Sequence, residues 1–145
     1  MEIRTILVAT DFSSHAERAF DWALELAARL GARVRVLHAY PLPYVGVGLN
    51  IPLPAEYFDG LREGAQQHLD AWAEKARAQG IEATTELLAE DPSTCIVESA
   101  HAHPTDLIVM GTRGLTGLGH VLLGSVADRT VRRAPCPVLV VPDKA

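Results

Sequence analysis

The stretch DLIVMGTRGLTGLGHVLLGSVADRTVRR, residues 106–133, decides the fold. It opens with an apolar run without alternation, which is typical of a strand buried on both faces of a sheet. It then passes through five of the chain's 11 glycines and ends in a predicted helix. Glycine loses more conformational freedom on folding than any other residue. The cluster therefore indicates that the backbone turns sharply there, or that another group approaches it closely.

The same alternation of strand and helix runs through the whole chain. Strands are predicted at residues 5–10, 33–40, 81–90, 106–111 and 135–142, and helical segments at 13–31, 55–79, 93–102 and 125–134. Ser14 with Glu17 fits a capping box at the start of the first helix, and Gly31 fits its end. Alternating strands and helices predict an α/β fold, a single parallel sheet with helices on both faces.

Length and composition narrow the classes of protein. The 145 residues fit one domain, residues 1–145, and 48% of them are hydrophobic. The net charge of −5 argues against nucleic-acid binding, which needs a basic surface. No apolar run is long enough to span a membrane, and the start does not resemble a signal peptide. Cys95 and Cys136 are too few for a disulfide framework, so we expect a cytoplasmic protein.

Two loops are predicted to form a ligand site. In open parallel sheets, ligands bind beyond the carboxyl ends of the strands, where the winding reverses. The loop after the first strand carries Thr10 and Asp11, and the loop after the fourth strand carries the glycines. Gly111 ends a buried strand, where we expect a side chain to block the ligand. The two loops are about 100 residues apart in sequence but can share one crevice.

The second loop has features of an anion site. Gly124 and Ser125 stand at the start of a predicted helix, whose free N–H groups and positive dipole end attract anions. Arg113 lies in the same loop, where it can meet a phosphate. The chain has no GxxxxGK[ST] motif, and no lysine lies between Met110 and Ala134. The chemistry is that of a phosphate-binding loop without its usual sequence.

The spacing of these glycines resembles that of a known family. GTRG, nine residues and then GS match the G-x2-G-x9-G-[S/T] signature of the ATP-binding branch of the universal stress proteins. Four further stretches are also similar to this family: ILVATDFS, LHAY, DLIVMGTRG and CPVLVV. The resemblance therefore covers the whole chain. It implies an adenine-nucleotide fold, related to the adenine nucleotide alpha hydrolases, with strand order 3-2-1-4-5. It also implies homodimers paired through the last strand, at Val138, Leu139, Val140 and Val141.

The resemblance also implies a set of binding residues. Asp11 would lie near the ribose or adenine, and Ala39 stands where members often have valine. Ala127 stands where many members have Thr or Asn, which removes one side-chain donor. Mg²⁺ or Mn²⁺ would be held mainly by phosphate oxygens, with no protein metal site. The implied residues around the base and ribose are Ala9, Thr10, Asp11, Ala39, Met110 and Gly111, and those around the phosphates are Arg113, Gly114, Gly124, Ser125, Val126 and Ala127.

Simpler interpretations exist for several of these residues. Asp11 can cap a turn before the first helix, and Gly111 and Gly114 can be turn residues. His38 ends a strand, where we expect it to be packed or hydrogen-bonded. His101 and His103 could share one side of an extended segment around a metal, but a solvated helix end is favoured because no third ligand accompanies them.

Three functions fit the sequence. The favoured one is a regulatory module of the stress response that binds ATP with slow or no turnover. The second is a slow ATPase or a nucleotide-dependent phosphotransferase, which needs a base or positioned water and a charge clamp. Asp11 is the only obvious carboxylate near the predicted ligand, and the resemblance gives it a binding role. The enzymatic function is therefore disfavoured. The third is a structural dimer with no nucleotide, against which the intact glycine signature counts.

Overall fold

A computed structural model describes residues 1–40, 54–112 and 123–143. The predicted loop at 41–53 lies outside these residues. The elements in chain order are β1 (Thr5–Ala9), α1 (Ser14–Leu30), β2 (Arg33–Ala39), α2 (Ala55–Ala78), β3 (Ala83–Leu88), α3 (Pro92–Ala102), β4 (Leu107–Gly111), α4 (Ser125–Arg133) and β5 (Val138–Val141). The strands form one parallel sheet of order β3-β2-β1-β4-β5, so the predicted class and strand order are confirmed.

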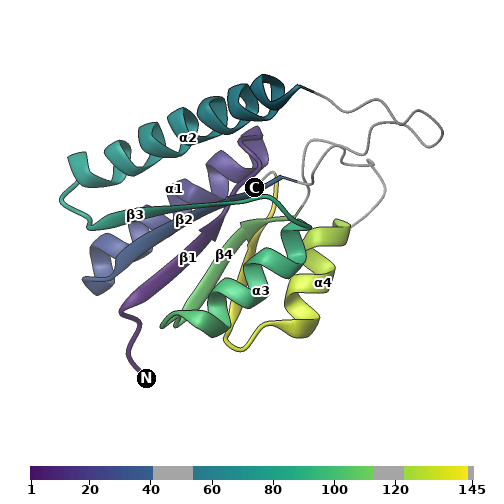
Figure 1. Cartoon of the computed structure of the whole chain (residues 1–145). Coiled ribbons are helices and arrows are strands. Elements are labelled where there is room, and N and C mark those ends of the chain that lie inside the picture. Colours follow the sequence, from purple (N-terminus) through teal and green to yellow (C-terminus); the bar gives the residue numbers. More distant parts are fainter. Residues whose placement is uncertain (41–53, 113–122, 144–145) are drawn as a thin grey trace.

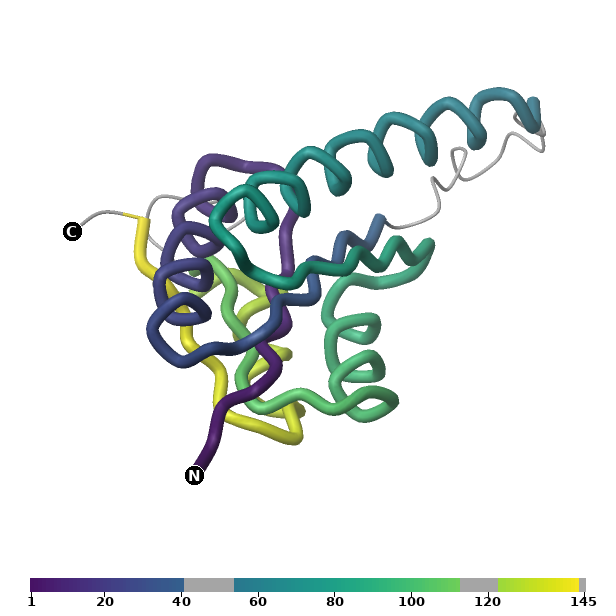
Figure 2. Tube along the Cα trace, turned by 90° about the vertical axis from the view of Figure 1, so that its left-hand side faces the viewer, coloured from purple at the N-terminus to yellow at the C-terminus, as the bar shows by residue number. Residues whose placement is uncertain are grey.

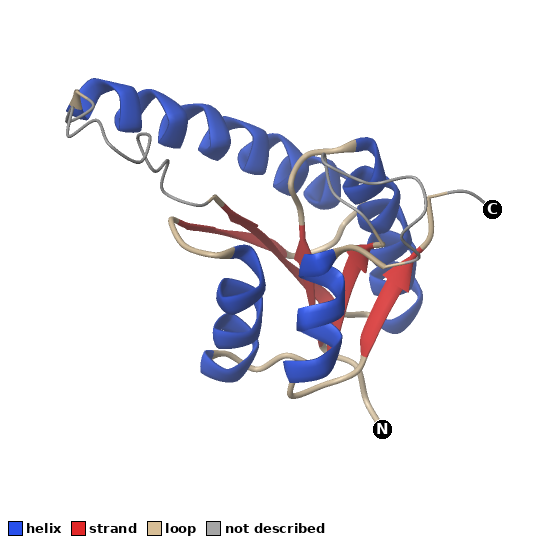
Figure 3. Cartoon of the chain, turned by 90° about the vertical axis from the view of Figure 1, so that its right-hand side faces the viewer, coloured by secondary structure: helices blue, strands red, loops and turns tan. Residues whose placement is uncertain are grey.

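The helices form two layers on opposite faces of the sheet. Figure 1 shows α1 and α2 on one face and α3 and α4 on the other, and Figure 3 shows the same arrangement from the side. On the first face, α1 lies over β1 and β4, and α2 lies over β2 and β3. Each connection between successive parallel strands runs back along the sheet as a helix. Two of these helices lie on each face, so both faces are covered.

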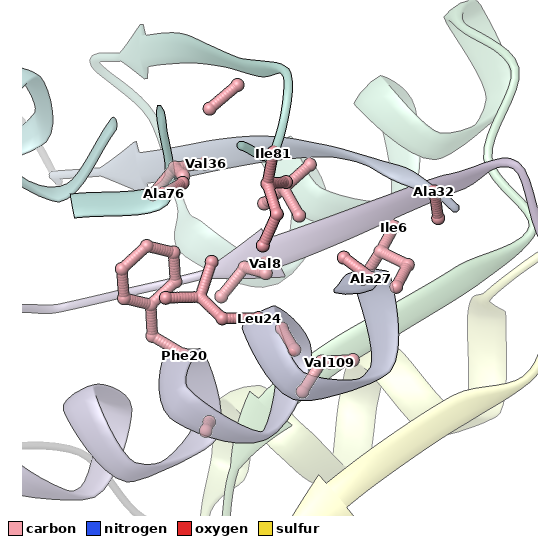
Figure 4. Close-up of a cluster of buried hydrophobic side chains, with 14 of the residues drawn as sticks. Ile6, Val8, Phe20, Leu24, Ala27, Ala32, Val36, Ala76, Ile81 and Val109 are labelled. Carbon is pink, nitrogen blue, oxygen red and sulfur yellow. The ribbon is translucent and has the colours of Figure 1, made fainter. Parts of the chain in front are cut away.

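A buried hydrophobic core lies between the sheet and each helix layer, and alternate residues of the central strands point into the two cores. On β1, Ile6 and Val8 face α1, whereas Leu7 faces the α3 and α4 layer. Phe20 and Leu24 of α1 meet Val8 in the first core (Figure 4). Because β1 is buried on both faces, its sequence is a continuous apolar run and not an alternating one.

Three predicted boundaries need correction. The capping box at Ser14 and Glu17 is wrong, because the N-cap of α1 is Ser13, whose hydroxyl accepts from the N–H of Ala16 at 3.2 Å. β3 is shorter than the predicted 81–90, because the N–H of Ile81 bonds to the end of α2 instead of a strand. β5 is shorter than 135–142, because three residues of that range, Pro135, Pro137 and Pro142, have no N–H and cannot donate to a ladder.

Helix α2 is longer than the sheet that it covers. Figure 2 shows its first turns projecting beyond the other described elements. Leu69, Ala73 and Ala76 in its second half are buried, whereas Tyr57 and Leu61 in its first half are exposed. In the described ranges, no helix is long and apolar enough to cross a membrane.

Candidate functional site

The carboxyl ends of β1, β2 and β4 meet at one edge of the sheet. Ala9 of β1 pairs with Leu37 of β2, and Val8 pairs with Val109 of β4. This register brings the two predicted loops together across the 100 residues that separate them. Of the residues expected near a base and ribose, Ala9, Ala39 and Met110 lie in one buried cluster on the face covered by α3 and α4.

The β1–α1 loop, Thr10–Ser13, is held by side-chain hydrogen bonds. The Thr10 hydroxyl accepts from the N–H of Phe12 at 2.9 Å, and a carboxylate oxygen of Asp11 accepts from the N–H of Ser13 at 3.0 Å. Asp11 therefore caps a turn before α1, as the simpler interpretation expects, while remaining partly exposed. Phe12 has a φ of 63°, in the left-handed region that residues with side chains rarely adopt.

His38 supports this loop from the neighbouring strand, as expected of a hydrogen-bonded residue. Its Nδ1 lies 2.8 Å from the carbonyl oxygen of Thr10, and its ring packs on Phe12. Burial lowers the pKa of His38 from its ordinary value, although the bond to Thr10 and the charge of Asp11 oppose this effect. The sequence did not indicate the role of Phe12, because nothing in its type signals a positive φ.

Gly111 has a packing reason that the sequence did not indicate. A Cβ atom at this position would lie 3.2 Å from the backbone oxygen of His15, in the first turn of α1. The glycine therefore lets the start of α1 approach the end of β4 closely. The predicted reason was room for a ligand, but the nearest neighbour of the absent side chain is the protein's own helix.

The junction between β4 and α4 is held by backbone hydrogen bonds. The N–H of Gly124 donates to the carbonyl oxygen of Thr112 at 2.6 Å, and the N–H of Thr112 donates to the carbonyl oxygen of Val141 at 3.2 Å. These bonds place the start of α4 beside the end of β4. Gly124 is the N-cap of α4, so the next N–H groups, of Ser125, Val126 and Ala127, are in the first helical turn and have no partner within the helix.

This junction fits an anion better than a metal ion. Free N–H groups and the helix dipole give the start of α4 a partial positive charge. Ser125 is exposed, Val126 is partly buried and Ala127 is buried. The predicted phosphate residues Arg113 and Gly114 lie outside the described residues. Within the described residues, no group of three or more His, Cys, Asp or Glu side chains could hold a metal.

Comparison with known proteins assigns the family. The sequence model of the universal stress protein family matches residues 2–142. The chain belongs to the universal stress protein family. It is 40% identical to a universal stress protein of Thermus aquaticus, covering 95% of this chain and 98% of the relative. It is 38% identical to one of Methanocaldococcus jannaschii, over 95% of this chain and 81% of the relative.

Solved structures of the family have the same fold, and two of them hold adenine nucleotides. UspA of Lactobacillus plantarum matches with a TM-score of 0.86 at 27% identity, over 97% of this chain and 99% of that one. A universal stress protein in complex with cAMP matches with a TM-score of 0.75 at 26% identity, over 99% and 100%. One of Archaeoglobus fulgidus in complex with dAMP matches with a TM-score of 0.68 at 29% identity, over 97% and 98%.

Proposed function

We propose that this universal stress protein binds an adenine nucleotide, ATP in the first instance, between the β1–α1 loop and the start of α4. The observation that carries the proposal is the bond from Gly124 to Thr112, which sets a helix N-terminus beside the strand ends that bear Thr10 and Gly111. A phosphate chain at the helix start would leave the base and ribose over these strand ends. The complexes of two structural neighbours with cAMP and dAMP support this ligand class.

Each predicted residue takes a role in this proposal. Asp11 would accept a hydrogen bond from the ribose or the adenine, and the buried Ala9, Ala39 and Met110 would lie under the base. Mg²⁺ or Mn²⁺ would be bound mainly through phosphate oxygens. The residues assigned to the phosphates are Arg113, Gly114, Gly124, Ser125, Val126 and Ala127, of which the first two lie outside the described residues.

A regulatory binding role is favoured over catalysis. Phosphoryl transfer needs a group that positions the attacking water or hydroxyl, together with a charge clamp. Asp11, the one carboxylate among the residues assigned to the ligand, also caps the turn before α1 by accepting from the N–H of Ser13, and we assign it to binding. We therefore propose one nucleotide-binding domain, residues 1–145, whose occupancy reports nucleotide state with slow or no hydrolysis. Its cytoplasmic location stays a prediction.

Two measurements test this function. Mass spectrometry of ligand released from the purified, denatured protein would identify a co-purified nucleotide without assuming one. Calorimetry with ATP, AMP and cAMP, each with and without Mg²⁺, would rank the ligands. We expect binding of at least one of them and little release of phosphate from ATP. Rapid phosphate release would favour the ATPase, and no binding of any ligand would favour the structural dimer.

We also propose that the protein is a homodimer paired through β5. In the described sheet β5 pairs only with β4, so its outer edge can accept a second chain. A two-fold axis would make the antiparallel pairing of Val138–Val141 self-complementary. Leu139, which is partly buried against the α1 face of the sheet, would lie near the axis.

Light scattering on the parent and on Leu139→Lys tests the dimer. We expect a dimeric parent and a variant that dissociates, because opposed lysines would face each other across the seam. Leu61→Lys, on the exposed part of α2, introduces the same charge away from β5 and serves as the control. A monomeric parent, or a Leu139→Lys variant that remains dimeric, would refute pairing through this strand.

A further inference from the structure

An aromatic cluster lies behind the loop that carries Asp11. The ring of Phe12 is 4.4 Å from that of His38, 4.9 Å from that of His68 and 5.7 Å from that of Trp72, measured between ring centroids. These partners come from β2 and α2, on the face of the sheet that α1 and α2 cover. The loop is therefore anchored to two elements that take no part in the proposed binding of the phosphates.

The backbone of Phe12 needs such an anchor. Its φ of 63° is in the left-handed region, which persists in a residue with a side chain only where the surroundings enforce it. Within the described residues, Phe12 is the only non-glycine residue with a positive φ. The turn that this conformation creates aligns the N–H of Ser13 with the carboxylate of Asp11. The orientation of Asp11 thus depends on the conformation of the next residue.

His38 contacts this turn in two ways. Its ring packs on that of Phe12 in a tilted arrangement, with 36° between the ring planes, and its Nδ1 lies 2.8 Å from the carbonyl oxygen of Thr10. A carbonyl oxygen can only accept, so Nδ1 carries the hydrogen and Nε2 is the unprotonated nitrogen of the neutral ring. The titratable groups that face His38 are Asp11 from the loop, His68 from α2 and Tyr40, which directly follows β2.

We propose that His38 is a positioning residue for the nucleotide: it holds the turn at Thr10, Asp11 and Phe12 in the conformation that presents the Asp11 carboxylate to the ligand. This inference rests on the proposed function, since it assumes that Asp11 meets the nucleotide. It adds a residue on β2 whose side chain acts through the loop and does not itself touch the ligand. Its donor and its ring make separate contributions, which substitutions can separate.

Three variants of His38 separate these contributions. His38→Phe keeps an aromatic ring to pack on Phe12 and removes the donor to Thr10. His38→Asn places an amide N–H near the position of Nδ1, and His38→Gln places it farther along the side chain, near the position of Nε2. Ile81→Ala is the control. It removes buried apolar contacts just before β3, at the amino ends of the strands, whereas the proposed site lies at their carboxyl ends. Calorimetry with ATP and Mg²⁺ measures affinity, and amide hydrogen exchange at Phe12 and Ser13 measures the order of the loop without ligand.

We expect His38→Phe and His38→Gln to weaken ATP binding about tenfold, as expected for the loss of one hydrogen bond, and to accelerate exchange at both amides. His38→Asn should recover most of the affinity and protection. Ile81→Ala should lower the Tm without changing either. Affinity and exchange in folded His38→Phe or His38→Gln equal to those of the parent would overturn the positioning role, as would His38→Asn behaving like His38→Gln.

The two readouts separate the inference from the proposed function. A parent that binds no adenine nucleotide would refute the function, whereas the exchange data would still decide whether His38 orders the turn. If the parent binds ATP and only the exchange changes in the variants, His38 orders the loop without positioning the ligand. That result would refute the inference and leave the function standing.

Discussion

The two walls of the proposed crevice are held in different ways. The β1–α1 loop is fixed by side chains, with Thr10, Asp11 and His38 each bonding to loop backbone. The start of α4 is fixed by backbone, through the bonds from Gly124 to Thr112 and from Thr112 to Val141. Substitutions in the first wall therefore remove specific partners. Substitutions in the second act mainly through the space that a new side chain occupies.

The two described glycines of the signature differ in the same sense. Gly111 has the backbone of His15 beside the place where a Cβ would stand, so its smallness serves the packing of α1 on β4. Gly124 has φ −67° and ψ 163°, an extended conformation open to any residue. Nothing in its backbone requires glycine, which points to the ligand as the reason for its small size. The same residue type thus serves folding at one position and, in our proposal, binding at the other.

The largest expected effect comes from Gly111→Val. The added Cβ would press on the His15 carbonyl, and the branch would add further contacts at the helix start. Overpacking of this kind costs up to about 3 kcal/mol, which for a chain of this length lowers the Tm by roughly 10 °C. Thermal unfolding followed by circular dichroism measures it, and Gly111→Ala should lose less. A fully stable Gly111→Val would show that α1 can move away without cost.

Gly124→Val should have the opposite profile. Its backbone angles suit valine, so we expect the Tm to change by only a few degrees. The branched side chain would occupy the proposed phosphate position, so ATP binding should fall at least about 100-fold, equivalent to about 2.7 kcal/mol. Gly64→Val is the matched control, since a Cβ there meets nothing within 4 Å. Unchanged affinity in folded Gly124→Val would remove the phosphate from the start of α4.

Much of this architecture was predictable from local sequence. The apolar run at Leu107–Gly111 identifies a buried strand, and Gly31 ends α1 with a φ of 67°, as a helix-terminating glycine should. The site was less predictable where its geometry depends on contacts between distant segments. The close approach of His15 to Gly111 and the left-handed Phe12 leave no local pattern, because both arise from packing between elements.

Asp11→Asn should affect binding less than Gly124→Val and hardly affect folding. The amide oxygen of asparagine can still accept from the N–H of Ser13, so the turn is kept. The loss is one hydrogen bond to a charged group, about 1.5–3 kcal/mol of binding free energy, which calorimetry with ATP would measure. Asp11→Ala, which removes the cap as well, should also lower the Tm. If Asp11→Asn binds as tightly as the parent, Asp11 serves only as a turn cap.

The smallest expected effect is a pH dependence of the free energy of unfolding that arises from His38, beside the β1–α1 loop. Burial lowers the pKa of His38 in the folded chain, so the unfolded chain takes up the proton first as the pH falls. The contribution of neutral His38 is complete above the unfolded pKa of about 6.5 and is lost as the pH falls through the lower, folded value.

Urea unfolding between pH 7.5 and 5 would detect this loss, with His38→Asn as the reference because asparagine does not titrate. The parent should lose more stability than the variant over this range, because only the parent carries the His38 imidazole. Protonated His38 still donates from Nδ1 to Thr10, so the cost comes from burying its charge beside His68 and not from breaking the bond. Identical pH dependence in the two chains would mean that solvent or Asp11 fully compensates the charge on His38. The β1–α1 loop, although held by side chains, would then make stability no more dependent on pH than the start of α4, which is held by backbone bonds.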